Sequence, residues 1–116
     1  MAGMLITVVE TVAFVARAKG RMNDEERRQA IDMIAADPES GRLIEGGGGL
    51  RKIRFGIGGR GKRGGVRIIY YLHNLSVPVF LLSVFAKNER DDLTKAELNQ
   101  LGKVAKQIAR TYGAKS

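Results

Sequence analysis

The residues of this chain that are suited to chemistry are cations, and they gather in one stretch. Eight Lys and Arg residues lie between Gly46 and Asn88 with no Asp or Glu among them, whereas the segment from Arg21 to Glu45 is net acidic. The whole chain of 116 residues carries a formal charge of +8. A solubilising surface normally mixes both signs, so a one-sign block favours a surface that binds a polyanion, nucleic acid above all.

These cations point to chemistry on a phosphate group in which positive charge, and not a histidine or carboxylate, assists the reaction. His73 is the only histidine, cysteine is absent, and the basic block holds no carboxylate. A lone histidine is more often a surface or strand-end residue than an acid–base catalyst. Lys and Arg can stabilise the negative charge that develops on a pentavalent phosphorus, and a lysine crowded by other cations has a lowered pKa and can exchange a proton. We expect no metal ion and no other cofactor.

A glycine-rich segment lies inside the basic block. Gly46 to Gly65 holds ten of the fifteen glycines, and Gly56 to Lys62 satisfies both GxGxxG and GxxxxGK. Both nucleotide-binding motifs require a helix directly afterwards, but Val66 to Leu72 is β-branched and aromatic, and Arg63 replaces the hydroxyl residue that binds Mg²⁺. A long hairpin loop without a function is uncommon, so we favour a phosphate-binding loop over a plain hairpin connection. Its cations are Arg60, Lys62 and Arg63.

The elements that must position these cations follow from local sequence signals. Asn23 with Glu26 and Thr94 with Glu97 have capping-box spacing and predict two helix starts, and Asp37-Pro38 predicts a helix end. The expected strands are 5–9, 50–57, 66–73 and 79–87, and the expected helices are 11–19, 24–36 and 95–112. We therefore predict one α+β domain over residues 1–116. Its order is β-α-α-β-β-β-α, with a small, mostly antiparallel sheet, two N-terminal helices on one face and a C-terminal helix.

Strand alternation groups the cations by face. Side chains two positions apart share a face of a strand, which groups Lys52 with Arg54, Arg67 with Tyr71, and Phe85 with Lys87. The alternative for such residues is an ordinary solvated strand face. If the three faces coincide, a concave basic patch forms beside the glycine-rich loop, with no acid to compensate it. We expect the helices to cover the opposite face.

Three segments, taken in order, resemble one family. They are Gly49 to Arg54, then Gly61 to Gly65 with Arg67 to Tyr71, and then Ala86 to Glu89. The set is similar to the HigB branch of the RelE/ParE toxin superfamily, and the likeness covers roughly residues 7–101. This resemblance implies a RelE-like fold and the toxin of a type II toxin–antitoxin pair. The implied activity is that of an mRNA interferase, a metal-independent endoribonuclease that acts on the ribosome and inhibits translation.

The resemblance also implies site residues. Family members cut RNA by attack of the 2′-OH on the adjacent phosphate, with basic residues on the sheet. By position, the catalytic set corresponds to Arg54, Lys62, Arg67 and Lys87. We expect RNA contacts from Arg51, Lys52, Arg60, Arg63, Tyr71 and Phe85. Many relatives carry Tyr where this chain has Phe85, which can stack on a base but cannot transfer a proton; Tyr71 is a weaker candidate for that proton.

The implied partners are a cognate antitoxin, usually of the helix-turn-helix type, the 70S ribosome with its mRNA, and operator DNA reached through the antitoxin. Charges interrupt the apolar stretch from Met4 to Met22, so we expect a cytoplasmic protein without membrane contact. Two alternatives stay open, namely a ParE-like toxin that inhibits gyrase and cuts no RNA, and a plain nucleic-acid-binding module. The cationic face favours RNA as the target.

Overall fold

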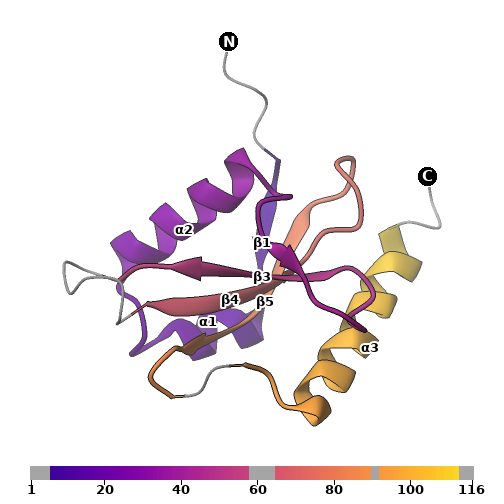
Figure 1. Cartoon of the computed structure of the whole chain (residues 1–116). Coiled ribbons are helices and arrows are strands. Elements are labelled where there is room, and N and C mark those ends of the chain that lie inside the picture. The colour runs from indigo at the N-terminus through magenta and orange to yellow at the C-terminus, as the bar shows by residue number, and fades with distance from the viewer. Residues whose placement is uncertain (1–5, 58–64, 90–91, 113–116) are drawn as a thin grey trace.

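The computed structural model describes residues 6–57, 65–89 and 92–112, and it confirms the predicted α+β class. Within this part of the chain, five strands form a single mixed sheet in the order β1-β5-β4-β3-β2 (Figure 1). The elements are β1 Val8–Glu10, α1 Val12–Ala18, α2 Asp24–Ala36, β2 Arg42–Leu43, β3 Leu50–Phe55, β4 Val66–Tyr71, β5 Val79–Ala86 and α3 Lys95–Tyr112. All strand pairs are antiparallel except β1 with β5. The sequence did not predict β2.

The helix starts form where the capping residues predict them. The Asn23 side chain accepts a hydrogen bond from the Glu26 N–H at 2.7 Å, and the Glu26 carboxylate accepts one from the Asn23 N–H at 2.9 Å. Before α3, the Glu97 carboxylate accepts a hydrogen bond from the Thr94 N–H at 2.8 Å, and the Thr94 hydroxyl accepts one from the Glu97 N–H at 3.1 Å. These reciprocal bonds satisfy backbone donors that have no partner inside a helix.

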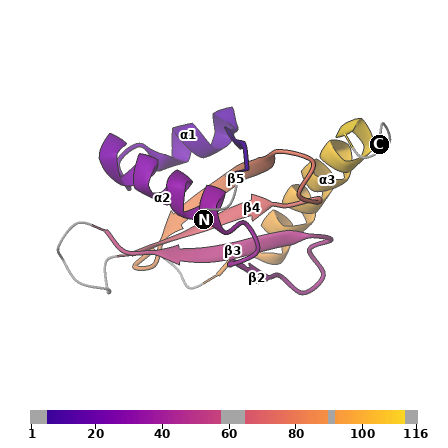
Figure 2. The ribbon, with the colours of Figure 1, turned by 90° about the horizontal axis from the view of Figure 1, so that it is seen from above.

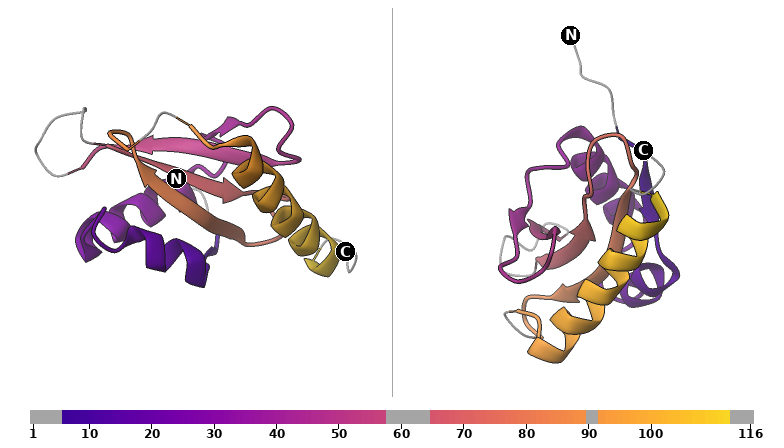
Figure 3. Two further views of the ribbon diagram at one scale, coloured as in Figure 1. Left: turned by 90° about the horizontal axis from the view of Figure 1, so that it is seen from below. Right: turned by 90° about the vertical axis from the view of Figure 1, so that its right-hand side faces the viewer.

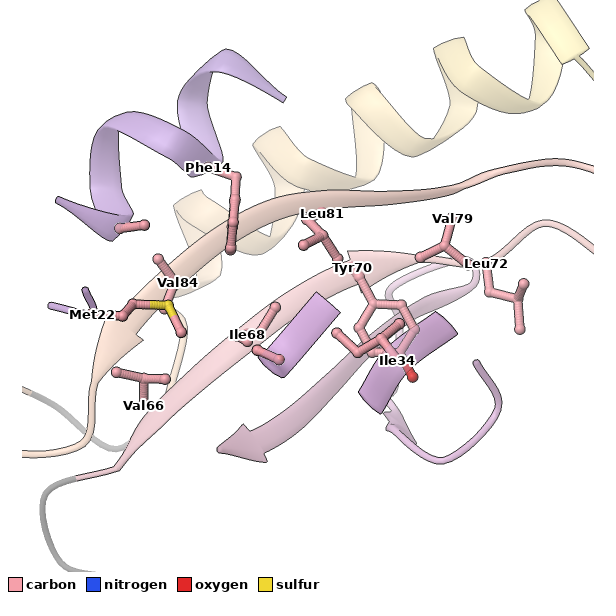
Figure 4. Packing of buried hydrophobic residues seen from close by; sticks show 12 residues of the cluster. Phe14, Met22, Ile34, Val66, Ile68, Tyr70, Leu72, Val79, Leu81 and Val84 are labelled. Atoms are coloured by element: carbon pink, nitrogen blue, oxygen red, sulfur yellow. The ribbon is translucent and has the colours of Figure 1, made fainter. Parts of the chain in front are cut away.

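Helices cover both faces of the sheet. Helices α1 and α2 lie on one face, where Phe14, Ile34, Ile68, Tyr70 and Leu81 form a buried cluster (Figure 4). Helix α3 lies on the other face (Figures 2 and 3). The expectation that the helices leave the patch face open was therefore wrong for α3, because the apolar residues on that face of β4 and β5 also need cover.

The patch face thus has two regions. Under α3, Ala105 belongs to a second buried cluster with Leu50, Ile69, Tyr71 and Phe85. The cations lie beside this cluster, toward the C-terminus of β3 and the N-terminus of β4. Strand β5 lies inside the sheet, between β1 and β4, and is almost wholly buried, as its apolar sequence predicted.

A buried tyrosine fixes the segment that leads into β2. The Tyr70 hydroxyl donates a hydrogen bond to the Pro38 carbonyl at 2.7 Å and accepts one from the Gly41 N–H at 2.9 Å. Burial raises the pKa of Tyr70 above its usual value, so the hydroxyl keeps its proton. A Cβ at Gly41 would lie 2.5 Å from the Tyr70 oxygen, so only glycine fits there. This contact sets the position of the next residue, Arg42.

None of the helices in the described part of the chain combines the length and the apolar character that a membrane crossing requires.

Candidate nucleic-acid interface

The strand register brings the predicted cations of β3 and β4 onto one face. Arg54 pairs with Arg67, and Arg67 pairs in turn with Phe85 on β5. One step along β3, Lys52 pairs with Ile69. Residues directly opposite each other on neighbouring strands project from the same face. The prediction that these three faces coincide is confirmed.

A hollow of about 430 Å³ lies where these cations meet the edge of the sheet. Strand β2 pairs only with Arg51 and Lys52 in the described structure, so β3 has an open edge from Ile53 onward (Figure 2). The hollow lies beside this edge. Its charged lining consists of Arg42, Lys52, Arg54 and Arg67, and Ser40 and Ile53 complete it. Four cations around one small hollow are suited to a phosphate group.

Arg67 is the cation best prepared to bind an anion. Its Nη1 atom is buried and has no hydrogen-bond partner within the described part of the chain. A buried charged donor without a partner is costly, and an oxygen of a bound phosphate would satisfy it. The guanidinium lines the hollow, and a shift of the side chains that cover Nη1 would let a phosphate oxygen reach it.

An acidic residue lies next to the cations, contrary to the expectation of a patch without acid. The Nζ of Lys52 donates a hydrogen bond to Oδ2 of Asp92 at 2.9 Å. The hydrogen bond from Lys52 and the nearby charges of Lys52 and Arg67 lower the pKa of Asp92, so Asp92 is a carboxylate at neutral pH. Asp92 therefore neutralises part of the charge of Lys52.

Arg51 lies apart from this hollow. It pairs with Tyr70 on β4, whose side chain belongs to the core beneath α1 and α2. Its guanidinium Nη1 donates to the backbone carbonyls of Glu39 at 3.0 Å and Gly41 at 2.8 Å. Arg51 thus lies on the opposite side of β3 from Lys52 and Arg54, because adjacent residues of a strand face opposite sides. Arg51 braces the segment that leads into β2. The RNA contact expected from Arg51 stays a prediction.

The two aromatic residues expected at the RNA surface are buried. Phe85 is 1% exposed and Tyr71 is 5% exposed, and both belong to the cluster under α3. The Tyr71 hydroxyl also lies 3.1 Å from Nδ1 of His73. Burial raises the pKa of Tyr71, which makes its hydroxyl a weaker acid. In this structure neither ring presents a face on which a base can stack.

Of the remaining predicted residues, the structure describes only Lys87. Lys87 follows β5 and is half-buried, and its backbone N–H donates to the Gly65 carbonyl at 3.0 Å. Lys87 therefore lies next to the point where the loop joins β4, outside the lining of the cationic hollow. Arg60, Lys62 and Arg63 lie outside the described residues.

Sequence reasoning missed Arg42 and Asp92. Arg42 belongs to the net acidic segment before the basic block, and Asp92 lies 40 positions after its partner Lys52. No spacing rule links either residue to the cations of β3 and β4. Only the pairing of Arg42 with Lys52 across β2 and β3, and the path of the chain from β5 to α3, bring them there.

Comparison with protein families gives a match over nearly the whole chain. The family described as "RelE toxin of RelE / RelB toxin-antitoxin system" matches residues 6–115.

Proposed function

The chain belongs to the RelE toxin family, which makes it the toxin of a toxin–antitoxin system, and we propose that it is a ribosome-dependent mRNA endonuclease that inhibits translation. The observation that carries this proposal is the cationic hollow, in which Arg42, Lys52, Arg54 and Arg67 surround a space of about 430 Å³. The resemblance to the HigB branch stays part of the proposal.

The proposed reaction needs charge stabilisation more than any other contribution. The 2′-OH of one nucleotide attacks the adjacent phosphorus, a new P–O2′ bond forms, and the P–O5′ bond breaks. The products are a 2′,3′-cyclic phosphate and a free 5′-OH. Extra negative charge gathers on the phosphate oxygens in the transition state, and preorganised cations such as the Arg67 guanidinium stabilise it.

The reaction also moves one proton from the 2′-OH and delivers one to the leaving 5′-oxygen. In this proposal Lys62 and Lys87 complete the catalytic set with Arg54 and Arg67. The proposal gives no metal ion a part in the chemistry.

The partners follow from the same premise. A toxin of this family has an antitoxin, and we propose one of the helix-turn-helix type, which links the pair to operator DNA. The remaining proposed partners are the 70S ribosome and its mRNA in the cytoplasm.

The test is an in vitro translation reaction in which the 5′ ends of the mRNA are mapped. We expect the purified protein to produce cuts inside translated codons, and we expect the same mRNA without ribosomes to stay intact. Absence of cuts on translating ribosomes would contradict the proposal. Gyrase-linked DNA breaks in place of RNA cuts would instead support a ParE-like inhibitor.

A further inference from the structure

A second hollow adjoins the cationic one. It has a volume of about 340 Å³ and lies between β2 and the start of α3. Its lining includes Arg42 and Lys52, the two carboxylates Glu45 and Asp92, and the apolar side chains of Leu93 and Leu98. This volume falls within the range of small-ligand sites, about 300–1,000 Å³, and the wall combines apolar with charged side chains.

Two residues connect the hollows. Arg42 and Lys52 line both of them, and they are directly opposite each other on β2 and β3. The two spaces therefore lie on either side of one pair of cations. In RNA a single sugar separates a base from its phosphate, so a strand whose phosphate occupies the cationic hollow has a base in reach of the second one.

The second hollow has the groups that a base requires. Leu93 and Leu98 offer apolar surface to the ring, and the exposed guanidinium plane of Arg42 can stack on it. Proteins bind unstacked RNA bases in this way and read their Watson–Crick edges by hydrogen bonds. The buried Phe85 and Tyr71 are not needed for this stacking.

The two carboxylates at this site, Asp92 and Glu45, keep open acceptor positions. Asp92 is held by two hydrogen bonds, from Lys52 Nζ to Oδ2 at 2.9 Å and from the Leu93 N–H to Oδ1 at 2.8 Å. Each carboxylate oxygen has a second lone pair and can accept one more bond. Glu45 is exposed and adds a second carboxylate to the wall.

We propose that the second hollow is a nucleobase subsite that selects bases carrying an amino group and rejects uracil. Cytosine, adenine and guanine each present an N–H₂ group to such carboxylates, as acidic side chains accept from cytosine N4. Uracil presents carbonyl oxygens on both sides of its single N–H, and these repel a carboxylate. This inference rests on the proposed nuclease function and names the feature that sets its sequence preference.

The test uses the mapped cleavage position in the translation reaction. Two series of mRNAs carry A, C, G or U on the 5′ side or on the 3′ side of the cut and are otherwise identical. In the series that varies the base bound in the second hollow, we expect the template with uracil to be cut at least about tenfold more slowly than the other three templates. A factor of this size, about tenfold, corresponds to one good base contact. Glu45→Gln, Asp92→Asn and the double variant should bring this ratio toward one, because amide side chains offer both donors and acceptors.

Asp32→Asn on α2 is the matched control, since it removes an exposed carboxylate far from both hollows and should keep the wild-type ratio. The readout is the ratio between templates, because loss of Asp92 also frees Lys52 and changes the overall rate. Glu45→Gln leaves the Lys52–Asp92 pair intact and keeps the test valid if the other variants misfold. Equal cutting of all four templates by the wild type, or an unchanged ratio in the variants, would overturn the subsite and leave the nuclease intact. Absence of any cutting would overturn both proposals.

Discussion

Arg67 and Arg54 are directly opposite each other on β3 and β4, and they differ in exposure. Arg54 is exposed, whereas Arg67 is half-buried and its Nη1 atom has no partner in the described structure. Arg54 can therefore turn toward a ligand from solvent, while Arg67 is held in place before the ligand arrives. Preorganised charges contribute most to stabilising a transition state.

Replacing either arginine should abolish growth arrest. We expect Arg67→Ala to lower the rate of mRNA cleavage by about 10²–10³, the usual loss for one preorganised donor, and Arg54→Ala to be impaired as well. The measurement is primer extension after a fixed time of translation. Arg110→Ala, which removes an exposed cation from the last turn of α3, is the control and should cut normally. Full toxicity of both folded variants would show that the hollow is not the site.

The burial of Phe85 changes the effect that we expect from replacing it. From the sequence, its ring was expected to stack on a base, so that Phe85→Ala would weaken RNA binding. With 1% exposure, the same substitution should lower the free energy of unfolding by about 3–5 kcal/mol, since it leaves a cavity. Urea denaturation measures this directly. Leu75→Ala, at a site that is 63% exposed, should change stability by only about 0.5 kcal/mol or less. A Phe85→Ala variant as stable as the wild type would contradict the packing described above.

At the scale of elements, sequence signals predicted helices and strands well where the interactions that form them lie close together in the chain. The capping residues Asn23 and Thr94 fix helix starts through bonds made within three residues, and an apolar run marked β5 as central. Strand β2 is different, because its two residues are exposed and pair only with β3. A two-residue strand that forms only by pairing with a neighbouring strand has no periodic pattern in its sequence. Sequence reasoning therefore missed β2, and it missed Arg42 for the same reason.

The same reasoning explains the site. Alternation along two strands joined by a hairpin was enough to place Lys52, Arg54 and Arg67 together. Asp92 reaches Lys52 only because the chain after β5 crosses the sheet before α3 begins. The amphipathic pattern of α3 showed which of its residues are buried, but it holds no information on which face of the sheet they contact.

The link between Tyr70 and Gly41 gives a prediction at this scale. Gly41→Ala places a Cβ 2.5 Å from the Tyr70 oxygen, so the hydroxyl must move and its bonds to Pro38 and Gly41 are strained or lost. We expect a loss of about 1–3 kcal/mol of stability, as for a buried polar group without a partner. Cleavage should also slow, since Arg42 directly follows Gly41.

Gly102→Ala is the matched control for this change. A Cβ at Gly102 meets nothing within 4 Å, and the residue lies inside α3. Alanine is favoured over glycine in a helix by about 0.8–1 kcal/mol, so this variant should be slightly more stable and fully active. Thermal unfolding and primer extension on both variants check the prediction. Equal stability of the two variants would show that the Tyr70 contact does not hold β2 in place.

On the scale of the whole molecule, charge is distributed unevenly over the two faces of the sheet. The cationic hollow opens on the face that carries α3, at the free edge of β3. Helix α2 covers the opposite face and carries Asp24, Glu25 and Glu26 in its first turn, with Asp32 further along. Arg27 and Arg28 pair with Asp24 and Glu25 and neutralise part of this charge. A partner that binds α2 therefore meets a weakly acidic surface, unlike the cationic one that RNA meets.

This asymmetry makes the mode of antitoxin inhibition testable. We expect the antitoxin to grip α1 and α2 and to exclude the toxin from the ribosome by its bulk, because a large rigid surface blocks a partner without touching the chemistry. Charge reversal at Lys62 and Lys87 should then leave antitoxin binding nearly unchanged. Asp32→Lys should weaken it, since complementary charge steers and orients association. A binding titration of each variant against the antitoxin, with Lys106→Glu on α3 as the control reversal, measures both effects. Weakened binding by the Lys62 and Lys87 variants with normal binding by Asp32→Lys would show instead that the antitoxin fills the cationic hollow.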